Sequence, residues 1–300
     1  MNATPATPAA LDLQAWVGRT QTTSDVISAV PLRQMAALMN DAQRMRDPMH
    51  AGPLPAGWHW LYFNPLEVQA KLGVDGHPER GDFLPPVQLP RRMWAGSRLH
   101  WQRDFVAGMQ VDKVSEIIKV SQKSGRSGEM VFVTVAHRYS DAAGLILEEE
   151  HDIVYREWAS SAETEALRVL GEQVRAGSHA FERQGQTVLP WTADSVMLFR
   201  YSAATFNGHR IHYDADYCRQ VEGYPGLVVH GPLLATLLLH LVQTQVAPGR
   251  ALARFEFRAL KPTFDLSGFH LHCSAEDDGL AVWTTNNIGQ VGVDGRVTLR

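Results

Sequence analysis

The stretch from 227 to 241, LVVHGPLLATLLLHL, constrains the fold of this chain more than any other segment. Leucine and valine side chains between Leu233 and Val242 cover nearly the whole circumference of a helix. A helix that is apolar on all sides is buried on all sides. Gly231-Pro232 suits its start, because proline at the first helical position has no N–H to leave unpaired. The run is about half of the roughly 18 to 20 residues that span a bilayer, so it predicts a buried core helix.

Strand-like segments lie on both sides of this helix. Four of them, between 93 and 158, are separated by turn signals at 107–108, 125–128 and 141–144, and predict an antiparallel meander. After the helix, RALARFEFRALKPTF, GFHLHCSAEDD, LAVWTTNNIGQ and VTLR predict four more strands. A central helix wrapped by an antiparallel sheet is the hot-dog arrangement. We therefore expect an α+β fold of two hot-dog units in tandem, each with a central helix.

Three other segments carry specific expectations. The pattern of TSDVISAVPLRQMAALMNDA, 23–42, predicts a helix capped by Thr23 or Ser24. GWHWLYF, 57–63, and SVMLFRYSAAT, 195–205, are each predicted as strands.

The change in sequence texture predicts where the domains begin and end. We expect an N-terminal hot-dog domain over 1–160, a charged helical connector over 161–187 and a C-terminal hot-dog domain over 188–300. The first half has no counterpart of the FNGHRIH segment of the second half. It is therefore expected to be catalytically degenerate and to form the opposite wall of the substrate pocket.

Charge and cysteine content exclude several classes of protein. With 28 basic and 32 acidic side chains, the formal net charge of −4 favours neither nucleic acid nor an anionic membrane as a partner. Cys218 and Cys273 have no metal-type spacing, and two cysteines form no disulfide framework. MNATPATPAALDLQAW lacks the basic start and apolar core of a signal peptide. These features predict a cytoplasmic protein with no metal and no cofactor.

A polar segment, FNGHRIHYD (206–214), precedes the apolar helix and is the main candidate for chemistry. Histidine titrates near pKa 6.5 and serves as a general base. The helix start at Gly231 presents free N–H groups and a positive dipole end to an oxygen that gains negative charge. An acid–base histidine facing such a site is sufficient, in principle, to add water across an enoyl thioester.

TFNGHRIHYD followed by PGLVVHGPLLATLLL resembles the signature of MaoC-like hot-dog enoyl-thioester hydratases. In that family an Asp lies five residues before a catalytic His, and a later Gly begins the hot-dog helix. LGVDGHPERGDFLPPVQLPRRMWAGSRLHW, 72–101, is similar to the double-hot-dog branch. That branch contains mesaconyl-CoA (3-methylfumaryl-CoA) and itaconyl-CoA hydratases and is related to type 2 hydroxyacyl-thioester dehydratases. The resemblance spans most of the chain.

The resemblance implies roles for three residues. His212 matches the catalytic histidine, and Gly231 matches the glycine whose N–H forms the oxyanion hole. Asn207 stands where the family has Asp. An amide cannot accept the proton, although it can orient a water molecule. His209 or Asp214 are the candidates for the missing acid–base group.

Four further residues are candidate substrate-binding groups. Arg210 could bind a CoA phosphate or a substrate carboxylate, or pair with Asp214 instead. His230, Arg92 and Trp94 are the others, each with a packing role as its alternative. HRIH alone lacks a convincing set of metal ligands.

The activity expected is reversible hydration of an enoyl-CoA, or of an acyl-carrier thioester, to the 3-hydroxyacyl form. The resemblance suggests a short, branched, dicarboxylic acyl group such as mesaconyl or itaconyl, and a homodimer or higher oligomer. A hot-dog thioesterase is the alternative, although the apolar helix lacks the acidic residue that such enzymes use. A non-catalytic acyl-thioester binding protein is a third possibility.

Overall fold

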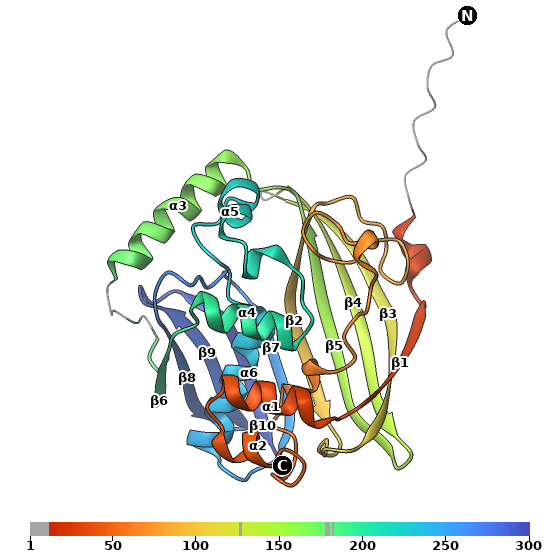
Figure 1. The fold of residues 1–300 in the computed structure, drawn as a ribbon. Coiled ribbons are helices and arrows are strands. Elements are labelled where there is room, and N and C mark those ends of the chain that lie inside the picture. Colours follow the sequence, from red (N-terminus) through yellow and green to blue (C-terminus); the bar gives the residue numbers. More distant parts are fainter. Residues whose placement is uncertain (1–11, 126–127, 178–180, 182) are drawn as a thin grey trace, which may run out of the picture.

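One antiparallel sheet of ten strands runs through the whole molecule (Figure 1). The computed structural model describes residues 12–125, 128–177, 181 and 183–300. Residues 1–11, and residues 126 and 127 of the predicted turn at 125–128, therefore lie outside the described residues. The strand order is β1-β3-β4-β5-β2-β7-β10-β9-β8-β6. The strands are β1 Thr20–Val26, β2 Arg91–Trp101, β3 Gln110–Gly125, β4 Gly128–Asp141, β5 Gly144–Arg156, β6 Thr187–Trp191, β7 Leu252–Ala259, β8 Phe269–Glu276, β9 Gly279–Asn286 and β10 Val291–Leu299.

Strands β2 and β7 join the two halves of the sheet. They pair antiparallel from Gly96 opposite Arg258 to His100 opposite Arg254. The first five strands form one half and the last five the other, so the two predicted hot-dog units share a continuous hydrogen-bonded sheet. The predicted α+β double hot-dog fold is confirmed.

Helix α3, with 16 residues, is the longest helix in the described part of the chain. The α-helices are α1 Ala29–Leu38, α2 Ala42–Arg46, α3 Ser161–Ala176, α4 Ser195–Ala204, α5 Ala215–Tyr217 and α6 Gly231–Leu241. The 3-10 and π segments are η1 Leu13–Trp16, η2 Trp58–Leu61, η3 Gln69–Lys71, η4 Arg210–His212, η5 Cys218–Glu222 and η6 Val242–Val246. None of the helices in the described part of the chain is long and apolar enough to cross a membrane.

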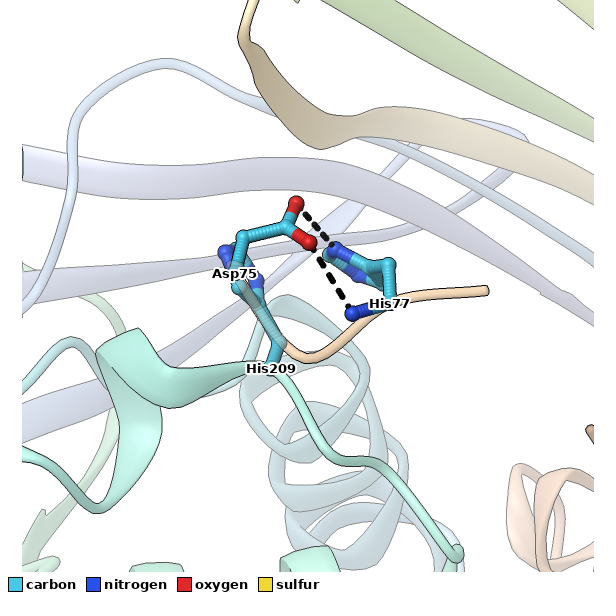
Figure 2. Close-up of side chains that lie close together, drawn as sticks. All are labelled: Asp75, His77 and His209. Atoms are coloured by element: carbon cyan, nitrogen blue, oxygen red, sulfur yellow. Dashed lines mark hydrogen bonds and ion pairs between the residues drawn. The ribbon is translucent and has the colours of Figure 1, made fainter. Parts of the chain in front are cut away.

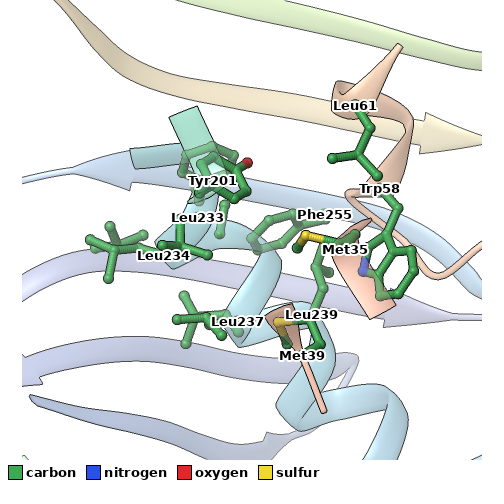
Figure 3. Close-up of a cluster of buried hydrophobic side chains, with 14 of the residues drawn as sticks. Met35, Met39, Trp58, Leu61, Tyr201, Leu233, Leu234, Leu237, Leu239 and Phe255 are labelled. Carbon is green, nitrogen blue, oxygen red and sulfur yellow. The ribbon is translucent and has the colours of Figure 1, made fainter. Parts of the chain in front are cut away.

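Helix α6 is the buried helix that the apolar run predicts. Its leucines are at most 2% exposed, and it packs against β8, β9 and β10. Figure 3 shows leucines of α6 against Phe255 of β7, and Met35 of α1 and Met39, the residue after α1, close to Leu239. Burying each leucine contributes roughly 1.5–3 kcal/mol, so this packing is a major source of stability and holds the start of α6 in place.

The first half is built differently around its helix. Helix α1 packs mainly on α2, α4 and η2 rather than along the first-half strands. The segment from α2 to β2 instead contributes buried aromatic side chains, including those of Trp58, Tyr62 and Phe63, to the main core. The interior of the first half therefore accommodates a loop segment and, as described below, part of a large cavity.

Two segments predicted as strands are helical. SVMLFRYSAAT forms α4, because the Asp194 side chain caps the N–H of Met197 and Leu198, Tyr201 and Ser202 form one buried face. That spacing of three and four residues is helical, whereas Val196 on the opposite face is 60% exposed. GWHWLYF contains the 3-10 turn η2, which buries its side chains between loops instead of in a sheet.

Two other expectations about the first half are wrong in detail. The helix predicted over 23–42 begins only at Ala29, after Ser28, and its expected start lies in β1, where β-branched residues pair with β3. The four predicted strands are not a simple meander. β3, β4 and β5 follow one another, but β2 pairs with β5 and β7, because β1 occupies the free edge of β3.

Candidate active site

A cavity of about 1300 Å³ lies between the two halves of the molecule. The second half contributes Asn207, His212 and Gly231 to its wall, and the first half contributes His77, Arg92 and Trp94. Sequence-predicted candidates as far apart along the chain as Arg92 and Gly231 thus share one space. The cavity exceeds the roughly 300–1,000 Å³ of ordinary small-ligand pockets, which suits an extended thioester.

The His212 side chain has a defined tautomer. Its Nδ1 lies 2.7 Å from the carbonyl oxygen of Val228. A carbonyl only accepts, so Nδ1 carries the proton and Nε2 has the free lone pair. Burial lowers the pKa of His212 to about 4, although the hydrogen bond to Val228 opposes the shift. The neutral ring is therefore ready to accept a proton at neutral pH.

His230 supports this ring from behind. The two imidazoles are stacked, with ring centroids 3.6 Å apart and planes 17° from parallel. His230 is completely buried, does not line the cavity, and its Nε2 lies 2.8 Å from Oγ of Ser202 on α4. The sequence suggested a substrate-binding role for His230, but this position makes it a support for His212. The contact was not predicted, because the segment that contains Ser202 was expected to be a strand and forms helix α4.

The start of α6 lies next to the His212–His230 stack, because Gly231 directly follows His230. Within the described residues, the N–H of Gly231 has no hydrogen-bond partner, and Gly231 lines the cavity. The nearest atom to a Cβ placed at Gly231 would be that of Trp94, at 3.9 Å. An open N–H at the positive end of a buried helix favours an oxygen that acquires negative charge.

Asn207 has a structural position in the turn after α4. Its Oδ1 accepts the N–H of His209 at 3.0 Å, and its own N–H donates to the carbonyl of Ser202 at 2.8 Å. The side chain borders the cavity, with its NH₂ group free of this turn. It can donate a hydrogen bond, but it has no proton to exchange.

Arg210 and Asp214 pair with one another, and of the two only Arg210 lines the cavity. Arg210 Nη2 lies 2.7 Å from Asp214 Oδ2, and Asp214 Oδ1 caps the N–H of Tyr217. Both carboxylate oxygens are therefore occupied, and Asp214 does not line the cavity. Arg210 also donates to the carbonyl of Val74, which fastens a first-half loop to the second half.

That loop brings Asp75 and His77 to the site, although neither residue is among the candidates of the sequence analysis. His77 Nδ1 lies 2.9 Å from Asp75 Oδ2, and the His77 N–H donates to Asp75 Oδ1. Figure 2 shows this pair beside His209, which comes from the other half. The His77 and His209 ring centroids are 4.1 Å apart, and those of His209 and His212 are 5.4 Å apart.

The three side chains Asp75, His77 and His209 also form a group that suits a cation in ligand type. Their nearest nitrogen and oxygen atoms all lie within 4.8 Å of one another. Arg92 and Arg80, however, act electrostatically on His77 from nearby, and positive charge disfavours a cation. The expectation of no metal stays a prediction.

Arg92 and Trp94 project from β2 into the cavity. In the described part of the chain, Arg92 has no carboxylate at ion-pair distance, whereas its neighbour Arg91 pairs with Glu163 of α3. The Trp94 indole donates to the carbonyl of Gly96 and to Ser97, which fixes its ring between the α6 start and His151. Arg92 is thus a cation available to an anionic ligand.

The concave face of the first half carries a buried polar cluster that the sequence analysis missed. Glu149 is 2% exposed and accepts hydrogen bonds from Trp60, Ser97 and Tyr139. His151 lines the same cavity, and burial lowers its pKa to about 4. The alternation of residues along β5 can be read from the sequence. Which of its two faces lines the cavity cannot, because this depends on how the sheet packs.

Comparison with known proteins gives a consistent result. The chain matches the family described as hydroxyacyl-thioester dehydratase type 2 over residues 57–265. It is 38% identical to "Mesaconyl-C(4)-CoA hydratase" of Chloroflexus aurantiacus over 96% of this chain and 98% of that one.

Solved structures share the fold at low sequence identity. A "MaoC-like dehydratase" superposes with a TM-score of 0.68 at 15% identity, covering 96% of this chain and 99% of the other. A Mycobacterium tuberculosis protein described as having a double hotdog fold gives a TM-score of 0.53 at 14% identity, covering 94% and 96%.

Proposed function

The chain belongs to the hydroxyacyl-thioester dehydratase type 2 family and is a hydro-lyase, and from this premise we propose that it hydrates a short, carboxylated enoyl-CoA at the cavity between its halves. The 3-hydroxyacyl-CoA is the product, and dehydration is the reverse path. His212 is the base, and the N–H of Gly231 is the oxyanion donor.

The observation that carries the proposal is the arrangement of these two groups. His212 and Gly231 both line the cavity, and His230, which directly precedes Gly231, stacks on the His212 ring. His212 Nε2 has a free lone pair, and the N–H of Gly231 has no partner among the described residues. The thioester oxygen binds the N–H of Gly231, and water attacks the β-carbon while His212 accepts its proton. The electron pair of the double bond moves into a thioester enolate. A general base contributes about 10²–10⁴-fold and an oxyanion donor about 10²–10³-fold.

The substrate proposal rests on Arg92 and on the relative. A free carboxylate on the acyl group could bind Arg92, which lines the cavity and has no carboxylate partner among the residues that the structure describes. The substrate in the relative's name, mesaconyl-C(4)-CoA, carries such a carboxylate. We therefore favour mesaconyl-CoA, with itaconyl-CoA as the second candidate and CoA rather than an acyl-carrier protein as the thiol.

The test incubates the purified protein with mesaconyl-C4-CoA, itaconyl-CoA and crotonyl-CoA, which has no carboxylate. Loss of the enoyl-thioester absorbance without release of thiol is expected, fastest for a carboxylated substrate. Thiol release would indicate a thioesterase, and no change with any substrate would indicate a binding protein. A preference for crotonyl-CoA would contradict the proposed substrate class.

The Arg92→Gln variant tests the carboxylate contact. A hydrogen-bonded charge contributes roughly 1.5–3 kcal/mol, so we expect KM for the carboxylated substrate to rise by about 10- to 100-fold. Turnover of crotonyl-CoA serves as the internal control and should change less than threefold. Arg91→Gln is the matched variant, because Arg91 is held by Glu163. Equal losses on both substrates would remove Arg92 from this role.

Three broader features complete the proposal. The domain limits 1–160, 161–187 and 188–300 place the acid–base loop in the C-terminal part and half of the pocket in the N-terminal part. The cytoplasmic location and the homodimer or higher oligomer stay predictions, for which fractionation and light scattering are the measurements.

A further inference from the structure

The proposed reaction needs a second proton-transfer group, since water loses a proton at one place and the α-carbon gains one at another. Asn207 cannot ionise, and Asp214 is held by Arg210 and Tyr217 away from the cavity. We propose that His77, oriented by Asp75, is this second group, so that the first half of the chain is catalytic. The inference rests on the proposed function.

The Asp75–His77 pair has the geometry of an oriented acid–base group. The carboxylate accepts from Nδ1 and from the backbone N–H of the same histidine, which fixes the ring. His77 lines the cavity, and its Nε2 has no hydrogen-bond partner among the described residues. A carboxylate on the far nitrogen of an imidazole holds its tautomer and stabilises the imidazolium. Asp75 and His77 are 15% and 16% exposed, so the pair is shielded without being sealed.

The pair is fastened to the His212 loop through main-chain contacts. The N–H of Arg210 donates to the carbonyl of Asp75 at 2.9 Å. A Cβ on Gly76 would lie 1.9 Å from the carbonyl oxygen of Gly208, so the two backbones touch only because residue 76 has no side chain. This close approach places the ring of His77 on that of His209, which in turn contacts His212.

The charges around His77 make its protonation depend on the ligand. Burial, followed by the positive charge of Arg92, lowers the pKa of His77 to about 4. Burial raises the pKa of Asp75, but its hydrogen bonds and the nearby positive charges outweigh this and lower it to about 2. An anionic acyl group bound to Arg92 would offset the charge of that residue and add to the effect of Asp75, so that both carboxylates favour the imidazolium against burial and Arg80.

The two histidines then divide the reaction between them. As the bond from water oxygen to the β-carbon forms, His212 Nε2 takes the proton of water and the double-bond electrons move to the enolate. The imidazolium of His77 gives its Nε2 proton to the α-carbon, which forms the new C–H bond. The proton on His212 leaves to solvent and His77 takes one up, so the net change is the addition of one water.

The test compares His77→Gln with His50→Gln in the purified full-length enzyme. His50 is an exposed histidine with the same 2.9 Å contact to an aspartate, Asp47, and serves as the matched control. For His77→Gln we expect kcat to fall by about 10²–10⁴-fold with KM changed less than threefold, and no change for His50→Gln. Melting temperatures check that both variants fold.

Rescue separates proton transfer from a structural role. Adding imidazole to His77→Ala should restore part of kcat, and the isosteric Asp75→Asn variant should slow kcat at least tenfold. Wild-type kcat in His77→Gln would overturn the inference. So would loss of wild-type activity with a chelator and its return with Zn²⁺, because the cluster would then be a metal site. If the wild-type enzyme hydrates no thioester, the proposed function itself fails.

Discussion

At the scale of single residues, the state of His212 follows from two neighbours and from burial. The carbonyl of Val228 decides which nitrogen holds the proton, and the stacked ring of His230 restricts rotation. Burial then lowers the pKa of the ring, so that it stays neutral at pH values well below the usual pKa of histidine. If His212 is the base, as we propose, its tautomer is set by this carbonyl and does not require a carboxylate at position 207.

The pH dependence of catalysis should report this state. Because the pKa of His212 is lowered to about 4, we expect the acid limb of the pH profile, where this ring gains a proton, to lie near pH 4. His212→Asn should lose about 10²–10⁴-fold of kcat. Steady-state kinetics from pH 4 to pH 8 provides the measurement. An acid limb near 6.5 would show that the ring is solvated in the free enzyme.

At the scale of elements, the site depends on two loops that meet across the halves. The turn that carries His77 follows η3, and the loop that carries His212 follows α4. Their contact is made by backbone at Gly76 and Gly208 and by the hydrogen bonds of Arg210. Rigid main-chain contacts of this kind fix distances more closely than side chains do.

The Gly76→Ala variant tests the loop contact. A methyl group at residue 76 would overlap the carbonyl of Gly208, so we expect the loops to separate and kcat/KM to fall at least tenfold. Gly52→Ala is the control, since Gly52 has nearly the same positive φ, 85° against 86°, but no atom within 4 Å of the added carbon. The control shares the backbone strain, of about 1 kcal/mol, without the collision. Equal losses of activity in Gly76→Ala and Gly52→Ala would show that the contact between residues 76 and 208 does not matter for catalysis.

At the scale of the whole molecule, the continuous sheet encloses many neutral histidines. Burial is the first cause that lowers the pKa of all of them, and the group comprises His77, His137, His151, His209, His212, His230, His240 and His272. Several belong to the cavity, but His272 lies on β8, where it contacts Thr285. Keeping these rings uncharged is a condition for the packed state.

Stability should therefore fall in acid. The unfolded chain takes up protons at a histidine pKa near 6.5, whereas the native sites resist until about 4. The histidine contribution is thus present above about pH 6.5 and is lost as the pH falls towards 4. Melting temperatures measured from pH 7.5 to pH 4.5 should drop steeply below 6.5. His272→Gln should flatten the slope and His50→Gln should not. A constant melting temperature would contradict the linkage.

Local patterns in the sequence determined the elements whose structure depends mainly on residues close together in the chain. The all-round apolar α6, most of the strands, and the placing of His212 just ahead of Gly231 follow from periodicity, turn residues and spacing along a short stretch. The Asp75–His77 pair, by contrast, was not predicted as part of the site. Its loop reaches the site through a contact between Val74 and Arg210, which are 136 residues apart in the chain.

Tertiary structure alone decided which neighbours each segment meets. α4 was predicted as a strand because its apolar content suits either state, and burial of one face by the core selects the helix. β2 lies between β5 and β7, whereas β1 pairs with β3. Which strand pairs at each sheet edge depends on several strands at once, so the sequence of a single strand does not determine it. Local residues determine how a segment folds, whereas the meeting of Asp75 and His77 with His209 depends on the path of the whole chain.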